Sequence, residues 1–181
     1  NHFPQLQSVD FSDNSFSGSF PSALLAYRSM QSLYFGKNCI TSVDLNQACS
    51  TNRLEILVLD GISSGKGCAG RIDTYKGNYY IQKNLRSSVP NCIFNISNFE
   101  TLQLSGIGFE GALDKNVALS KSMQVLSLNH NRIGGVLPDA FFESTTLTSL
   151  NLEQNFITGT WNLLQDQKSM TLKMSKNRLS G

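Results

Sequence analysis

The 181-residue sequence is short of charged residues. Aspartate, glutamate, lysine and arginine make up 15% of it, against about 25% in an average soluble domain. The net charge is only +2, so the chain has no strong positive field and nucleic acid is not an expected partner. Serine, asparagine and glycine are abundant instead, with 24, 17 and 14 residues.

Long apolar runs are missing too. No run of about 18 apolar residues is present that could form a membrane span, and no stretch has the pattern of a signal peptide. Apolar residues still make up 40% of the chain, too many for a disordered segment. The sequence starts at Asn1 without methionine and stops at Gly181 within a repeated pattern. We therefore expect it to be part of a longer chain, or to have its ends covered by a partner.

Histidine is scarce, since His2 and His130 are the only two. The four cysteines contain no CxxC pair, so a zinc site is not expected. Carboxylates recur at no facing positions, and His130 has no nucleophile as a partner within the repeat pattern, so catalysis is not expected either. We predict a protein that is not an enzyme and that has no metal and no cofactor.

The cysteines suggest an oxidising compartment. They fall within one 54-residue stretch, at Cys39, Cys49, Cys68 and Cys92. Their even number favours two disulfides, although four free thiols would fit the same count. A single N-glycosylation acceptor, Asn95 followed by Ile96 and Ser97, agrees with this compartment. We expect a secreted or cell-surface protein.

One short motif recurs seven times. Each copy has apolar residues at its fourth and sixth places, and five copies end in asparagine at the ninth place. The ninth places are Asn14, Asn38, Ile62, Ile107, Asn131, Asn155 and Asn177. Their steps are 24, 24, 45, 24, 24 and 22 residues, so one step is long by about 21. We place a single insertion at about residues 63–90.

A second pattern follows each ninth place. It has an apolar residue, usually a glycine two places later, and then another apolar residue. It reads FSGSF from Phe16, IGGVL from Ile133 and ITGTW from Ile157. In the third unit it is displaced to Cys68. Because both patterns recur in register, chance is a poor explanation.

The alternating apolar residues predict short strands with one buried face. One such strand cannot bury that face alone, but stacked 24-residue coils bury a continuous core and pair each strand with its neighbours. We expect one parallel sheet with strands near residues 7–11, 31–35, 55–59, 100–104, 124–128, 148–152 and 171–174. The ninth-place asparagines are structural, because their amides can satisfy backbone groups that turn inward there.

These motifs resemble the leucine-rich repeat family, in the 24-residue class of plant receptor ectodomains and plant inhibitor proteins. The likeness rests on LxxLxLxxN followed by LxGxxP-like segments, and it covers nearly the whole chain. It implies an α/β-type, mostly β solenoid: a right-handed coil with a parallel concave sheet and an irregular or 3-10 convex side. It also implies a second, smaller sheet along one flank. We expect one solenoid over residues 1–181, with about seven repeats.

The concave surface is where this fold usually binds its ligands. Candidate binding residues lie between the strand leucines or just after them. They are Asp10, Tyr34, Lys37, Val58, Asp60, Gln103, Ser127, His130, Asn151 and Glu153. Only Tyr34, together with Lys37 and Asp60, is of the kind that anchors an interface. The alternative is that most of these residues are solvated strand positions.

The insertion is a second candidate surface, because long loops in compact proteins are often functional. It mixes aromatic and cationic residues. They are Tyr75, Lys76, Tyr79, Tyr80, Lys83 and Arg86. The alternative is that the insertion is a surface loop without a binding role, held in place by disulfides.

The function expected from the resemblance is that of a non-enzymatic extracellular scaffold that binds a protein, peptide or glycan. The alternative is an assembly module of an extracellular matrix, filament or cell-surface complex, which contacts copies of itself or other subunits. Asn95 precedes the strand near residues 100–104 and should lie exposed on the convex side, where it would carry a glycan.

The phase of the repeat constrains the disulfides. Cys39 and Cys49 lie in one coil on different sides of the solenoid, so they should be too far apart to bond. Residues at equal phase in neighbouring coils stack about 4.8 Å apart. We therefore predict Cys39–Cys68 and Cys49–Cys92. The rival is Cys68–Cys92, which would only close the inserted loop.

Overall fold

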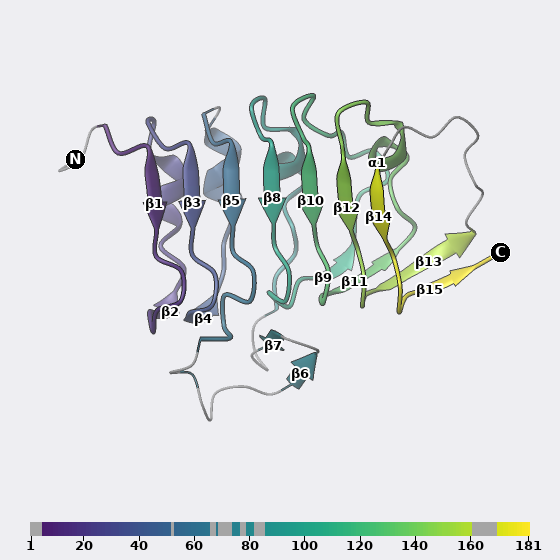
Figure 1. Cartoon of the computed structure of the whole chain (residues 1–181), viewed down its shortest axis with the longest axis horizontal. Helices are drawn as coiled ribbons and strands as arrows, with labels where there is room; N and C mark the ends of the chain where they lie inside the picture. The colour runs from purple at the N-terminus through teal and green to yellow at the C-terminus, as the bar shows by residue number, and fades with distance from the viewer. Residues whose placement is uncertain are drawn as a thin grey trace.

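Seven short parallel strands form the main sheet of the protein (Figure 1). The computed structural model describes residues 5–51, 53–65, 68, 74–76, 79–81, 86–160 and 170–181, and only the backbone of 74–76 and 79–81. In sheet order the strands are β1 (Ser8–Asp10), β3 (Ser32–Tyr34), β5 (Ile56–Val58), β8 (Thr101–Gln103), β10 (Val125–Ser127), β12 (Ser149–Asn151) and β14 (Thr171–Lys173). The expected strand positions and their parallel pairing are confirmed.

The insertion does not interrupt this sheet. Strand β5 pairs directly with β8, and Leu57 lies opposite Leu102 in the register. The middle residue of each strand from β3 to β12 is a leucine with no exposed surface, so these leucines stack into the core. Each of these burials is worth about 1.5–3 kcal/mol relative to an exposed side chain.

A second sheet runs along the flank where the strands of the main sheet end (Figure 1). It has two parts. The larger is β9 (Glu110–Ala112), β11 (Arg132–Gly135), β13 (Phe156–Thr160) and β15 (Arg178–Ser180), and the smaller pairs β2 (Ser17–Ser19) with β4 (Cys39–Ser42). The gap between the two parts falls at the coil that carries the insertion. Part of the insertion forms an antiparallel hairpin of β6 (Thr74–Lys76) and β7 (Tyr79–Ile81).

Short helices lie behind the main sheet (Figure 1). They are the 3-10 helices η1 (Ser22–Ala26), η2 (Asn46–Ser50) and η4 (Asn91–Asn95) and the α-helix α1 (Ala140–Glu143). This arrangement confirms the mostly β solenoid with a 3-10 convex side. In the part of the chain that the structure describes, no helix has the length and apolar character needed to cross a membrane.

The ninth-place asparagines hold the coils together through their side-chain amides. Asn131 is fully buried. Its Oδ1 accepts hydrogen bonds from the backbone N–H groups of residues 107–109, at 2.9–3.2 Å. Its Nδ2 donates to the carbonyls of Leu104 and Leu128, both at 2.8 Å. Asn131 therefore has the structural role predicted for the ninth-place asparagines.

The residue before each ninth place has a left-handed backbone. All seven have φ between 52° and 63°. They are Asp13, Lys37, Gly61, Gly106, His130, Gln154 and Lys176. Glycine adopts this conformation freely, whereas other residues carry a cost of about 1–2 kcal/mol. Five coils therefore bear this cost at a position directly beside the candidate binding face.

Two disulfides join neighbouring coils. Cys39 bonds to Cys68 with their Cα atoms 5.3 Å apart, and Cys49 bonds to Cys92 with their Cα atoms 5.5 Å apart. This is the pairing that the repeat phase predicts, and the rival Cys68–Cys92 pairing is wrong. Disulfides are typical of proteins that fold outside the cytosol, in agreement with a secreted or cell-surface location.

Candidate functional site

The face of the main sheet turned away from the core, named the open face here, presents one side chain from the last residue of each strand. In register across the sheet these are Asp10, Tyr34, Val58, Gln103, Ser127, Asn151 and Lys173. The neighbouring apolar residue in each strand, Val9 in β1 and a leucine in the others, points into the core, so strand alternation turns these residues outward. The structure thus places six predicted candidates in one row.

A polar cluster lies beside this row, where the strands end. The Oδ1 of Asp60 accepts the backbone N–H of Ser105 at 2.7 Å, across the junction that the insertion leaves between β5 and β8. The Oγ of Ser105 donates to the Oδ1 of Asn129 at 2.6 Å. The Oγ of Ser127 donates to the same oxygen, also at 2.6 Å. With His130, these four residues form the central polar network.

The hydrogen bonds of Asn129 fix the proton of the His130 ring. Because its Oδ1 accepts two hydroxyl groups, its Nδ2 is the atom that faces His130, 2.7 Å from the ring Nδ1. An amide nitrogen only donates, so Nδ1 accepts and the proton of the neutral ring lies on Nε2. The imidazole is therefore part of an ordered polar chain.

Asp60 is the half-buried carboxyl of the network. Burial raises its pKa above the ordinary value of 3.8, and the hydrogen bonds from Ser105 offset this only in part. Among the residues that the structure describes, no lysine or arginine forms an ion pair with Asp60. Its ionised form therefore lacks full compensation, and a donor or cation brought by a ligand would supply it.

The expected grouping of Tyr34, Lys37 and Asp60 is only partly present. The Nζ of Lys37 pairs with the carboxylate of Asp13 at 3.3 Å, so this exposed ion pair turns it toward the preceding coil and not toward Asp60. Gly36, next to Lys37, lies against the backbone of the following coil, where an added Cβ would approach the Asp60 carbonyl oxygen to 2.7 Å. A side chain does not fit there, because the two coils come too close.

The C-terminal end of the open face contains a second polar pair. The Oγ of Ser175 donates to the Oε1 of Glu153 at 2.5 Å. The backbone N–H of Glu153 donates to the Oδ1 of Asn151 at 3.2 Å. Glu153 and Asn151, both predicted candidates, thus lie together three coils away from Asp60.

The insertion candidates can be placed only in part. Lys83 lies outside the described residues. Of the hairpin, the structure describes the backbone register, in which Tyr75 pairs with Tyr80 and Lys76 with Tyr79. Arg86 is exposed, and its Nη1 lies 3.8 Å from the Oε2 of Glu110.

Asn95, the predicted glycan acceptor, is exposed at the end of η4. This helix lies behind the main sheet, so a glycan there would leave the open face clear.

Sequence reasoning missed two members of the network, Ser105 and Asn129. Both are buried, with exposed fractions of 0% and 5%, although they stand in the same repeat position as the half-buried Asp60. Only the repeat alignment could have drawn attention to them, since a row of mostly solvated positions gives no sign of which members turn inward.

Comparison with known proteins agrees with this geometry. The Leucine Rich Repeat family model matches residues 5–26 and 122–143. Receptor-like protein 13 of Arabidopsis thaliana is 29% identical over 160 residues. The match covers 87% of this chain but only 13% of that protein, so the chain spans a small part of its relative's length.

Solved structures share the fold. The Arabidopsis receptor kinase HAESA, in complex with the peptide hormone IDA and the co-receptor SERK1, has a TM-score of 0.78 and 24% identity, over 98% of this chain and 26% of its own. A plant ice-binding protein has a TM-score of 0.74 and 19% identity, over 97% and 51%. These two proteins differ in what they bind, so the fold alone does not select a ligand. The repeated motif, the parallel sheet and these likenesses together support a leucine-rich repeat protein of the plant type.

Proposed function

We propose that this chain is a non-enzymatic extracellular recognition scaffold whose open face binds a peptide or protein segment. The observation that carries this proposal is the central polar network around Asp60. It joins three neighbouring coils through hydrogen bonds and presents a half-buried carboxyl without an ion-pair partner among the described residues.

The chemistry of the network suits a peptide. A peptide backbone offers N–H donors to a carboxylate such as that of Asp60. Tyr34 lies three strands away from Ser127, with β5 and β8 between them, and adds the one aromatic side chain of the row on the open face. Aromatic side chains are frequent anchors of protein interfaces.

The relatives support the same class of ligand. HAESA, which has this fold, was solved with a peptide hormone and a co-receptor, and RGFR1, a plant peptide hormone receptor, was solved with RGF2. Transferred to this chain, their mode of binding supports a peptide or protein ligand for the open face and assigns no catalytic residue.

The test selects peptides and then maps where they bind. A random-peptide phage library is panned on the immobilised protein, and the dissociation constants of the selected peptides are measured by calorimetry. Asp60→Asn and Tyr34→Ala should each weaken binding about tenfold or more, the loss expected for one charged hydrogen bond or one aromatic anchor.

The matched control is Asp139→Asn, the same change at an exposed residue beside α1, outside the open face. It should leave the affinity unchanged. Selected peptides that bind all three variants equally would place recognition elsewhere. Binding to an oligosaccharide array, with no peptide selected, would contradict the peptide assignment.

A further inference from the structure

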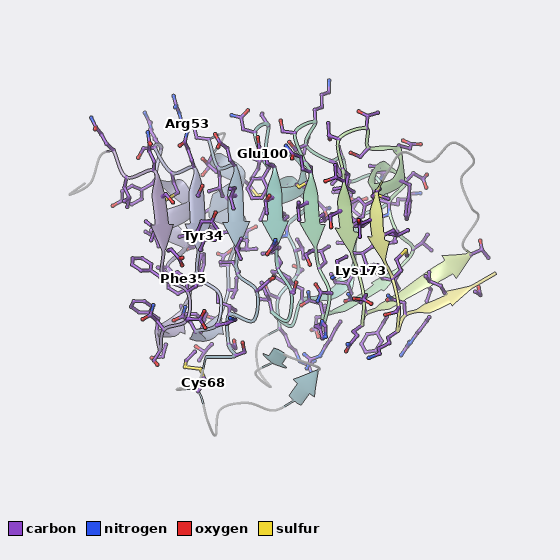
Figure 2. The ribbon with its side chains drawn as sticks, in the orientation of Figure 1. Tyr34, Phe35, Arg53, Cys68, Glu100 and Lys173 are labelled. Carbon is purple, nitrogen blue, oxygen red and sulfur yellow. A yellow bond between two sulfur atoms is a disulfide. The ribbon has the colours of Figure 1, made fainter. Side chains whose placement is uncertain are left out.

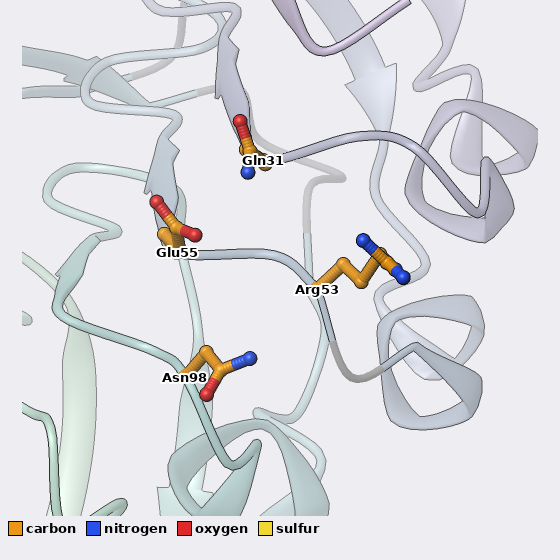
Figure 3. A pocket seen from close by; sticks show the side chains of 4 residues that line it. All are labelled: Gln31, Arg53, Glu55 and Asn98. Atoms are coloured by element: carbon orange, nitrogen blue, oxygen red, sulfur yellow. The ribbon is translucent and has the colours of Figure 1, made fainter. Parts of the chain in front are cut away.

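Two hollows lie at the edge where the chain enters the strands, off the open face. The first has a volume of about 310 Å³ and is lined by Gln31, Arg53, Glu55 and Asn98 (Figure 3). The second has a volume of about 480 Å³. Its lining residues are Ala26, Arg28, Cys49, Ser50, Thr51 and Arg53. Arg53 lines both, and it lies at the edge of the solenoid in Figure 2.

Arg53 does not use the carboxylate nearest to it in the sequence. Glu55 lies two residues later and lines the same first hollow, yet the described residues show no ion pair between them. Figure 3 shows the guanidinium of Arg53 pointing away from Glu55. Among the described residues, the lining of the second hollow has two arginines, Arg28 and Arg53, and no carboxylate.

The walls of the second hollow are held in place. Helices η1 and η2 pack side by side, and their last residues, Ala26 and Ser50, line it. The disulfide from Cys49 to Cys92 ties η2 to η4 in the next described coil. The backbone N–H of Thr51 donates to the Ala48 carbonyl at 3.2 Å, which fixes the chain just before Arg53. A rigid wall lowers the entropy lost on binding.

We propose that the second hollow is an oxyanion site that binds the carboxylate of an acidic peptide segment of a partner protein. Two guanidinium groups in one hollow form the arrangement that recognises a carboxylate with paired, charge-assisted hydrogen bonds. Aspartate and glutamate side chains supply such carboxylates on protein surfaces. This site does not depend on the ligand proposed for the open face.

The test follows the arginine Nε–H signals in NMR spectra of ¹⁵N-labelled protein. The probe is the blocked peptide acetyl-Asp-Glu-Asp-amide, and acetyl-Asn-Gln-Asn-amide is its uncharged control. We expect saturable shifts of Arg28 and Arg53 with the acidic peptide only. Arg28→Gln and Arg53→Gln should each weaken binding about tenfold, as expected for the loss of a charged hydrogen-bond pair.

Arg178→Gln is the matched variant, because Arg178 lies over the Phe156 ring of the second sheet, 4.6 Å from its centroid. It removes the same charge away from the hollow and should leave binding unchanged. If the Nε–H signal of Arg178 shifts as much as those of Arg28 and Arg53, the peptide interacts with arginines through charge alone, and the proposed site is overturned. Inorganic sulfate is the second probe: saturable sulfate binding without binding of the acidic peptide would overturn the peptide assignment. Thermal melts verify that each variant folds.

Discussion

Asn131 should be among the most sensitive positions in the solenoid. In Asn131→Ala, the backbone N–H groups of residues 107–109 lose the acceptor that Asn131 provides. The Leu104 carbonyl loses the one donor that the described residues show for it. The Leu128 carbonyl keeps a second donor, the amide of Asn155, at 2.9 Å. Four buried groups are therefore orphaned, and at about 1 kcal/mol each, the low end for such groups, the loss is about 4 kcal/mol.

Two other asparagines make this estimate a graded series. Asn155→Ala orphans the N–H of Ile133 alone, because each carbonyl that the Asn155 amide reaches has another donor. It should cost about 1–2 kcal/mol. Asn14 is exposed and reaches only two carbonyls, which water can satisfy, so Asn14→Ala should cost less than about 1 kcal/mol.

Urea unfolding followed by far-UV circular dichroism measures the series. With a slope of about 2 kcal/mol per molar urea, Asn131→Ala should lower the midpoint by about 2 M. Equal losses for the three variants, or a loss below about 1 kcal/mol for Asn131→Ala, would refute the accounting by orphaned groups.

Three further predictions concern the pKa of Asp60, glycosylation of Asn95 and the two disulfides. Because burial raises the pKa of Asp60 above 3.8, the stability contributed by its protonated form is lost as the pH rises through the raised pKa. Asp60→Asn should then raise the free energy of unfolding at pH 7 by about 1.4 kcal/mol per unit of that rise and have no effect near pH 3, and a loss at pH 7 would contradict this. Asn95 should carry a glycan in protein secreted by a plant cell, and intact mass before and after deglycosylation decides it: an unchanged mass removes the claim. The disulfide between the exposed Cys49 and Cys92 should open under mild reductant before the other, whose sulfurs are buried, so alkylation mapping that finds the reverse order would be inconsistent.

The repeat made most of the fold predictable. Apolar residues at a constant phase specify which side chains stack, so Leu57 and Leu102 could be aligned although 45 residues separate them. The same phase gave the disulfide partners, because residues at equal phase in neighbouring coils are close in space. Cys68 obeys this rule even though it lies within the insertion.

Other features have no periodic signal. The hairpin of β6 and β7 and the split of the second sheet arise inside the insertion, where no repeat constrains the chain. The central polar network depends on the buried Ser105 and Asn129, and sequence phase alone does not distinguish them from solvated neighbours. Arg28 and Arg53 are 25 residues apart, one more than a repeat, and only the folded chain shows that they line one hollow.

The central polar network and the first hollow both adjoin the junction between β5 and β8. A solenoid of equal coils offers equivalent positions all along its length, so a unique site requires a place where the repeat is broken. The insertion provides that place: Ile62 replaces an asparagine and the second sheet is interrupted there. At one end of the strands Asp60 crosses the junction to Ser105. At the other end the first hollow takes Glu55 from one side of the junction and Asn98 from the other. The irregular coil, which costs the fold some of its regular hydrogen bonding, is therefore where this chain gains chemistry that its neighbouring coils do not repeat.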